Sequence, residues 1–290
     1  MKKHGFTLIE VLVVTGIMAV LAGLLFPVFA SAREAAFKTS CASNLKQISV
    51  STLLYTTDYD DRFMIVSYQP VGVQNSRTDR TWVQLLLPYV KNFRTFTCPS
   101  DHSPRDPSDS TFDQDLVPGD SYSAYYTMSQ HVNYGYNFQY LSPIVIRGNQ
   151  TENLPRTTTL ADSPSKSILF VDSVHDRDQQ GNPIGGGNWL VVPPCRYYVA
   201  AGSKAPIDTF SSVQIGGSFY TPSNGWESMA RNSSSLYGGA WPWHRGRMNV
   251  AMLDGSVKSM RPIDLTRGCE VRSEWHGWIQ DLTEYPWNLD

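Results

Sequence analysis

A long apolar stretch near the N-terminus constrains this chain more than any other feature of its sequence. It extends from Phe6 to Ala30, and Lys2 and Lys3 precede it. A helix over these residues, about 25 in number, would be about 37 Å long, enough to cross a hydrocarbon core of about 30 Å. Because basic residues favour the cytoplasmic side, we expect the N-terminus in the cytoplasm and everything after Ala32 outside.

Glu10 is the one ionisable side chain in this apolar stretch. A carboxylate in hydrocarbon costs on the order of a few kcal/mol, so a residue of this kind indicates a function. A buried charge becomes tolerable when it is paired with an opposite charge. Glu10 is therefore a candidate functional residue whose partner has to be named.

The segment Gly5-Phe6-Thr7-Leu8-Ile9-Glu10 resembles the processing site of type IV prepilins and type II secretion pseudopilins. The resemblance implies that a prepilin peptidase cuts after Gly5, that the new N-terminal Phe6 is methylated, and that the apolar helix is retained. It also implies a partner for Glu10, the terminal ammonium of Phe6 on a neighbouring subunit. Pro27 lies where many type IV pilins carry a helix-bending proline. The implied surroundings are the peptidase, the inner membrane and other subunits of a type IV pilus or a type II secretion pseudopilus.

An ordinary secretory signal peptide is the alternative interpretation of the same stretch. Ala30-Ser31-Ala32 has the small residues of a cleavage site, and the released protein would begin at Arg33, for example as a secreted enzyme. The apolar stretch is longer than the usual length of roughly 7 to 15 residues, and Glu10 would have no role in it. We therefore favour the prepilin interpretation.

The chain continues beyond Arg33 as an amphipathic helix. Because no proline interrupts it between Val28 and Gln69, the apolar and amphipathic parts should form one stem of about 50 residues. The acidic cluster from Asp58 to Asp61 should end this helix, since carboxylates oppose its dipole there. We expect a leader at 1–5, a transmembrane and stem helix at 6–57 and a β-rich head at 58–290. The expected fold class is α+β, with the long helix packed on an antiparallel sheet that carries long loops. The predicted buried face consists of Phe37, Cys41, Leu45, Ile48, Thr52 and Tyr55.

Several elements of the head are predicted from apolar runs, proline and turn residues. They are a short helix at Trp82–Val90 closed near Lys91, a strand at Phe93–Thr97, a loop at His102–Asp120, a partly buried strand-like region at Tyr122–Tyr140, a buried strand at Ser167–Asp172, a turn-rich segment at Asp176–Asn188, an irregular segment at Pro193–Tyr237, and a hairpin at Met248–Met260 that turns at Asp254-Gly255.

The four cysteines indicate disulfides, because their number is even and the chain is expected to be exported. Four cysteines allow three connectivities. Proximity in sequence suggests that Cys41 pairs with Cys98, tying the stem to the head, and that Cys195 pairs with Cys269. No Cys-x-x-Cys spacing occurs, so a zinc or redox motif of that kind is not predicted.

A second resemblance concerns the C-terminal part of the head. His244 and Asp254-Gly255, taken with the segments Cys41–Ile48 and Cys98–Asp101, are similar to a family of bacterial prepilin-like proteins with a His-x9-Asp-Gly signature. The simplest role for this signature is structural. Gly255 would supply the positive φ of a hairpin turn, and His244 would hydrogen-bond the turn or a nearby backbone carbonyl.

Composition argues against several other functions. Charged residues make up 17% of the chain and the net charge is −2, so no basic surface for nucleic acid is expected. No Gly-x-Ser-x-Gly elbow occurs, and we expect no enzyme activity. The 8 Trp and 15 Tyr would suit carbohydrate stacking, so a membrane-tethered surface-binding module is an alternative function.

Calcium is the one cofactor considered, and two acidic groups are weak candidates for it. Asp176 and Asp178 precede Gly181 with the spacing of an EF-type loop, but Gly187 stands where the bidentate carboxylate belongs. Asp58 and Asp60 form the other group, next to Asp61. For both we favour a solvated turn, and no cofactor is predicted.

Overall fold

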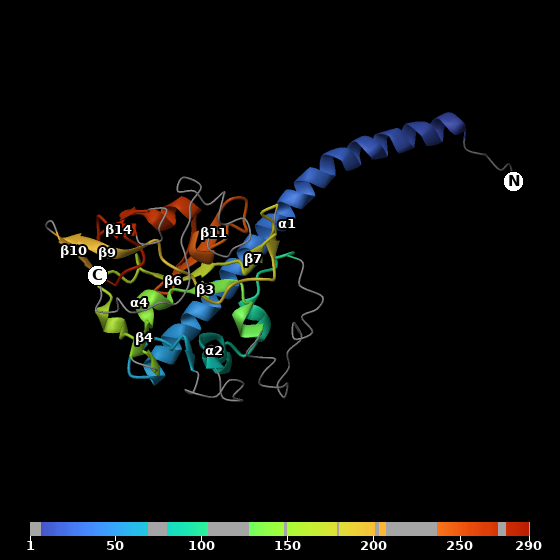
Figure 1. The fold of residues 1–290 in the computed structure, drawn as a ribbon. Coiled ribbons are helices and arrows are strands. Elements are labelled where there is room, and N and C mark those ends of the chain that lie inside the picture. Colours follow the sequence, from blue (N-terminus) through green and yellow to red (C-terminus); the bar gives the residue numbers. More distant parts are fainter. Residues whose placement is uncertain are drawn as a thin grey trace.

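One long helix, α1 (Leu8–Asp58), organises the computed structural model of this chain (Figure 1). The structure describes residues 7–68, 80–103, 128–147, 150–178, 180–200, 203–206, 237–271 and 277–289. Helix α1 has 51 residues and is therefore about 76 Å long at about 1.5 Å per residue. It continues through Pro27 and ends at Asp58, so the predicted single stem is confirmed.

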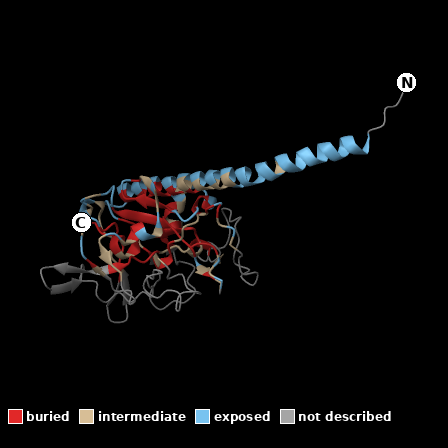
Figure 2. Cartoon of the chain, turned by 90° about the horizontal axis from the view of Figure 1, so that it is seen from above, coloured by how far each residue is buried: buried red, intermediate tan, exposed pale blue. Residues whose placement is uncertain are grey.

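The N-terminal half of α1 projects away from the rest of the molecule (Figure 2). Every Leu, Ile, Val, Met and Phe from Leu8 to Phe29 is at least 51% exposed. Apolar side chains surround this part of the helix on all sides, so no single face can pack on a sheet. Within the chain as described, this half has length and apolar character sufficient to cross a membrane.

The C-terminal half of α1 lies against the head along one face. Cys41, Leu45, Ile48, Thr52 and Tyr55 are buried, as the spacing predicted, and the first three are not exposed at all. Phe37 is only partly buried, because it lies near the edge of the head, where its ring faces His102 at 5.9 Å.

The sheet beneath α1 has the strand order β12-β11-β6-β3, and all its neighbours are antiparallel. Its two faces belong to two different cores. Phe170 and Ala251 are paired in register and pack in the core that contains α1, whereas the next pair, Val171 and Val250, packs on the opposite face. The strands are β3 (Tyr134–Tyr136), β6 (Ile168–Asp172), β11 (Met248–Met252) and β12 (Val257–Met260). The predicted strand at Ser167–Asp172 and the predicted hairpin are thus confirmed.

A second sheet was not predicted. It has the order β10-β9-β14-β13 and is mixed, because β14 runs parallel to β9. The irregular segment expected at Pro193–Tyr237 contains two of its strands, and residues 207–236 lie outside the described residues. The strands are β9 (Cys195–Ala200), β10 (Ser203–Pro206), β13 (Cys269–Glu270) and β14 (Gly277–Ile279).

The segment after α1 contains one confirmed prediction and one error. Helix α2 (Trp82–Val90) ends at Val90 and is capped by Lys91, whose φ of 62° is left-handed. The strand predicted at Phe93–Thr97 is instead a 3-10 helix, η1 (Phe93–Phe96). The side chain of Asn92 accepts a hydrogen bond from the Arg94 amide and starts this turn, and the i,i+3 spacing buries Phe93 and Phe96 together.

The remaining elements are short. The region expected to be strand-like at Tyr122–Tyr140 is helical at 128–130, then forms β3 and then a helix, α4. Asn137 precedes α4, and its side chain donates to the carbonyls of Ile168 and Trp287. Residues 122–127 and the loop residues 104–120 lie outside the described residues. The other elements are β1 (Ser67–Tyr68), β2 (Arg80–Thr81), α4 (Phe138–Leu141), β4 (Ile144–Arg147), β5 (Gln150–Asn153), η2 (Thr158–Leu160), β7 (Asp176–Arg177), β8 (Pro183–Ile184), η4 (Tyr237–Gly239) and η5 (Pro262–Thr266).

Candidate functional site

The N-terminal end of α1 carries Glu10 in its first turn. The Thr7 amide and the Thr7 hydroxyl both donate to Glu10 Oε2, at 2.8 and 2.7 Å, and the Glu10 amide donates to Thr7 Oγ1 at 3.4 Å. These reciprocal hydrogen bonds form a capping box, which satisfies backbone donors that a helix start otherwise leaves open. Gly5 and Phe6 lie outside the described residues, so the expected pairing of Glu10 with a Phe6 ammonium stays a prediction.

This capping role was missed from the sequence, although the signal was present. Thr7 and Glu10 have the Ser/Thr-x-x-Glu/Gln spacing of a capping box directly before an apolar run. Within one chain, Glu10 therefore already has donors for one of its carboxylate oxygens. The exposed position of this carboxylate leaves it accessible to a further partner.

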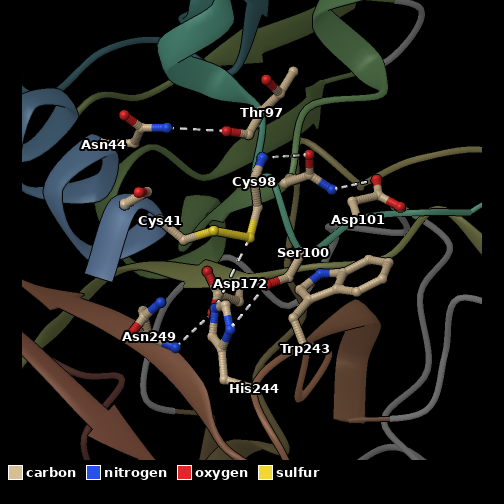
Figure 3. Close-up of a disulfide and its surroundings, with 12 residues drawn as sticks. Cys41, Asn44, Thr97, Cys98, Ser100, Asp101, Asp172, Trp243, His244 and Asn249 are labelled. Atoms are coloured by element: carbon tan, nitrogen blue, oxygen red, sulfur yellow. Dashed lines mark hydrogen bonds and ion pairs between the residues drawn. A yellow bond between two sulfur atoms is a disulfide. The ribbon is translucent and has the colours of Figure 1, made fainter. Parts of the chain in front are cut away.

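A buried polar cluster lies beside the Cys41–Cys98 disulfide, between α1 and the head (Figure 3). At its centre is His244, 2% exposed, in the loop before β11. Its Nε2 lies 3.3 Å from Oδ2 of Asp172 at the end of β6, and its Nδ1 lies 3.1 Å from Oε1 of Glu34 on α1. Ser100 donates to the same Glu34 oxygen at 3.0 Å.

The charges in this cluster determine the protonation of His244. Burial lowers the pKa of His244, but the hydrogen bond and charge of Asp172, followed by those of Glu34, more than offset this and leave the pKa above its usual 6.5. Burial raises the pKa of Asp172, and hydrogen bonds from His244 and the Asn249 amide, with the charge of Lys38, reduce that increase. His244 therefore lies between two carboxylates, and their hydrogen bonds and charges favour its protonated form.

The expectation that the His244 side chain would hydrogen-bond the hairpin turn or a backbone carbonyl is wrong. It contacts side chains from α1, β6 and the segment after η1, because the fold brings these three elements to the same point. The backbone of His244, in contrast, exchanges hydrogen bonds with Arg247.

The other part of the signature, Asp254-Gly255, contacts α1 further along its length. Lys46 Nζ donates to the Gly255 carbonyl at 2.6 Å, and Gly255 has the predicted positive φ, 78°. A Cβ at Gly255 would lie 3.4 Å from Leu53 Cδ1 on α1. Asp254 Oδ1 accepts from the Ser256 amide at 2.8 Å and holds the loop closed. His244 and Gly255 thus bracket β11 and attach both of its ends to the stem helix.

The two disulfides join the cysteines that sequence proximity suggested. Cys41 and Cys98 are linked with Cα atoms 5.0 Å apart, and Cys195 is linked to Cys269. The first bond connects α1 to the segment after η1 and lies beside the cluster, with Cys98 Sγ 3.9 Å from His244 Nε2. One ligand atom from each of Cys41, Cys98 and His244 lies within 4.8 Å of the others, although the two sulfurs are oxidised to a disulfide.

Ser100, His244 and Asp172 superficially resemble a catalytic triad. Ser100 Oγ is 3.3 Å from His244 Nδ1, but it donates to Glu34 and the residue is only 7% exposed. A nucleophile must instead reach a substrate and give its proton to the base. The arrangement is that of a buried hydrogen-bond network.

The acidic residues considered for calcium serve as turn and cap acceptors. Asp178 accepts hydrogen bonds from Gln180 and Asn182, and the hydrogen bonds from Asn182 hold the pKa of Asp178 below its usual value. Asp176 Oδ1 accepts from the Arg177 amide. In the other group, Asp58 accepts from the Tyr89 hydroxyl at 2.7 Å, and Asp60 follows with a left-handed φ of 52°.

Comparison with known proteins gives one match. Residues 1–26 match the family model for the prokaryotic N-terminal methylation motif. Searches of curated proteins and of solved structures find no match. The motif, together with the apolar helix that begins within it, supports a type IV pilin-like protein with a single-pass membrane anchor.

Proposed function

We propose that this chain is a structural subunit of a type IV pilus or a type II secretion pseudopilus. A prepilin peptidase removes residues 1–5, Phe6 is methylated, and α1 holds the subunit in the inner membrane until it joins a filament. The observation that carries the proposal is the exposed apolar half of α1, from Leu8 to Phe29, which largely coincides with the methylation motif matched at residues 1–26.

The exposed apolar side chains of the N-terminal half of α1 favour a state in which lipid or other helices always cover them. Each large apolar side chain gains about 1.5–3 kcal/mol when it is fully buried. From Leu8 to Phe29 these side chains remain exposed on the isolated chain, so lipid or neighbouring helices have to cover them. A membrane covers them before assembly, and the apolar helices of other subunits cover them in the filament.

The proposed orientation places the head on the outer side of the inner membrane. Lys2 and Lys3 favour a cytoplasmic N-terminus. Two disulfides fit a head that matures in an oxidising compartment. In the filament, the heads face outward and the apolar halves of α1 form the centre.

Glu10 is proposed to set the axial position of each subunit. One of its oxygens accepts from Thr7, and its exposed carboxylate is proposed to meet the Phe6 ammonium of a neighbour. A charged group in an apolar filament centre is costly when its opposite charge is missing. Subunits at the wrong axial position would leave such charges unpaired and would be disfavoured.

The test replaces Glu10 by Ala in the native host, with Thr15→Ala as the control on the same segment. We expect Glu10→Ala to be processed normally but to give little filament, because the capping box and the neighbour's partner are both lost. Thr15→Ala should assemble normally, because the Thr15 hydroxyl donates, among the described residues, only to two carbonyls of its own helix. Shed or membrane-extracted assemblies are measured by sedimentation. Normal filament yield from Glu10→Ala would contradict the proposal, and a wild-type chain that never sediments would favour the tethered binding module.

A further inference from the structure

The base of the head, where α1 passes from Phe29 and Ala30 to Arg33, carries exposed arginines on both sides of the helix. Arg245 Nη2 donates to Ser31 Oγ at 2.7 Å, and Arg33 is exposed two residues further along α1. Because a helix turns by about 100° per residue, Ser31 and Arg33 point about 200° apart around its axis. The two arginine side chains therefore flank α1, directly after its last apolar residues.

The backbone conformation of Arg245 is one that arginine rarely adopts. The amides of His244 and Arg247 each donate to the carbonyl of the other residue, at 2.9 and 3.1 Å. Arg245 and Gly246 are thus the two central residues of a tight turn, and their φ angles are 52° and 77°. Asn, Asp and Gly are the residues favoured in such turns, because other side chains are strained at positive φ. Strained residues of this kind cluster at functional sites, so the side chain of Arg245 is a candidate for a function.

The acidic residues of α1 leave the positive charge of these arginines unneutralised. Glu34 directs Oε1 to His244 Nδ1 at 3.1 Å and accepts from Ser100 at 3.0 Å. The next acidic residue of α1 is Asp58, which lies about 37 Å further along the helix than Arg33 at about 1.5 Å per residue. Among the described residues, neither Arg33 nor Arg245 forms an ion pair with a carboxylate. The base of the head is therefore positively charged.

The position of this base along α1 matches the head-group layer of a bilayer. The apolar half of the helix, which ends near Phe29, is long enough to cross the hydrocarbon core. Ser31 and Arg33 lie about 3 and 6 Å beyond Phe29 along the axis. The polar head groups extend about 5–7 Å beyond the hydrocarbon on each side, and they contain the lipid phosphates. Both arginines thus lie at the level of these phosphates.

We propose that Arg33 and Arg245 bind the phosphates of anionic phospholipids at the outer surface of the inner membrane, one on each side of α1. A guanidinium group has five N–H donors in a planar fork that fits phosphate. The contact of Arg245 with Ser31 engages only Nη2, so further donors of this guanidinium can reach a lipid. The proposal rests on the proposed function in one respect, because it requires α1 to remain in the membrane. The lipid contact would hold the base of the head on the membrane and would have to break when the subunit enters a filament.

The first test measures how accessible each arginine is in the full-length chain reconstituted in lipid nanodiscs. One preparation contains phosphatidylcholine alone, and the other contains phosphatidylglycerol in addition. An arginine-selective dicarbonyl reagent is added, and mass spectrometry measures the modification rate at each arginine. We expect phosphatidylglycerol to slow the modification of Arg33 and Arg245 about fivefold, the effect of one basic residue at an anionic surface.

Arg62 is the control within the same molecule. It is exposed and lies beyond the C-terminal end of α1, so its modification rate should be the same in both nanodiscs. Equal rates in the two nanodiscs at Arg33 and Arg245 would overturn the proposal. Equal slowing at all three arginines would also overturn it, because that result would indicate a general effect of lipid charge on the reagent.

The second test counts the lipids that the full-length chain retains in detergent when equal amounts of the two lipids are added. Native mass spectrometry of the wild type should show a preference for phosphatidylglycerol, which Arg33→Gln/Arg245→Asn should lose. Asn suits the left-handed conformation of the turn, so this variant should keep the fold. Arg62→Gln removes the same charge at the other end of α1 and should keep the preference. An unchanged preference in Arg33→Gln/Arg245→Asn would refute the assigned residues. Displacement of the lipid by inorganic phosphate at equal concentration would assign the site to a free anion instead.

Failure of this proposal can be distinguished from failure of the proposed function. Both tests measure lipid contacts of a single full-length chain, and neither requires a filament or cleavage after Gly5. A chain that forms filaments but shows no lipid preference would refute only the lipid contact. A chain that loses α1 in its native host would refute the proposed function, whatever lipids the full-length chain binds.

Discussion

The two halves of α1 belong to one uninterrupted helix, yet their surroundings are opposite. Leu21 is 61% exposed and Leu45 is not exposed at all, although both are leucines in regular helix. The difference lies in the residues around them. Apolar side chains surround Leu21 on every side, whereas polar residues flank the stripe that contains Leu45. A one-sided stripe selects a sheet of the same chain, and an all-round apolar surface requires a membrane or other helices.

The change between the halves occurs within one turn of the helix. Arg245 donates to Ser31 Oγ at 2.7 Å, and His244 meets Glu34 at 3.1 Å. Both contacts come from the loop that precedes β11. The head therefore begins to contact the stem directly after the last apolar residues, Phe29 and Ala30, which places its base at the edge of the proposed membrane segment.

The largest effect on the buried half should come from His244→Ala. This change leaves Asp172 as an unpaired carboxylate that is completely buried, and the loss of one partner of a buried pair costs about 3–5 kcal/mol. Denaturant unfolding of the oxidised chain in detergent, followed by tryptophan fluorescence, measures the loss. Arg245→Ala, next to it on the exposed side of the loop, should cost less than about 1 kcal/mol. A loss below 1 kcal/mol for His244→Ala would show that the cluster does not hold the stem.

A matched pair of leucines, one in each half of α1, tests the comparison between the two halves. Leu45→Ala should reduce the unfolding free energy of the head by about 2–5 kcal/mol, because it opens a cavity in a closely packed core. Leu21→Ala should change it by no more than about 0.5 kcal/mol, since the Leu21 side chain is 61% exposed in the structure. If both variants lost the same stability, the two halves would not differ as described.

A smaller effect should appear in the pH dependence of the unfolding free energy. The pKa of His244 is raised in the folded protein, so the stability it contributes is complete below about pH 6.5 and is lost as the pH rises through the folded-state pKa. Asp172 on β6 and Glu34 on α1 are the charged groups that raise this pKa. The difference in unfolding free energy between wild type and His244→Gln should therefore narrow as the pH rises through the folded-state pKa of His244. A difference that grows with pH would mean that His244 is neutral in the folded chain.

Patterns local in sequence predicted much of this fold. The spacing from Cys41 to Tyr55 identified the buried face of α1, and Asp254-Gly255 identified the β11–β12 hairpin. The strand predicted at Phe93–Thr97 failed because a short run with two phenylalanines fits a strand or a 3-10 turn equally well, and the side chain of Asn92 favours the turn.

The cluster around His244 could not be predicted in the same way. Glu34 and Ser100 are 66 residues apart, and His244 is 144 residues beyond Ser100. No spacing rule connects such positions, since only the packing of α1 on the sheet brings them together. The capping box of Thr7 and Glu10, in contrast, is local in sequence and could have been predicted from the sequence alone.

The mature N-terminus of the protein from its native host tests the central claim most directly. Mass spectrometry of the purified chain should find N-methylated Phe6 as the first residue, with the leader of residues 1–5 absent. A Gly5→Glu variant should keep the leader, which controls for the assigned cleavage position. A mature chain that begins at Arg33 would contradict the account, because the apolar N-terminal half of α1 would then be discarded and could form no filament.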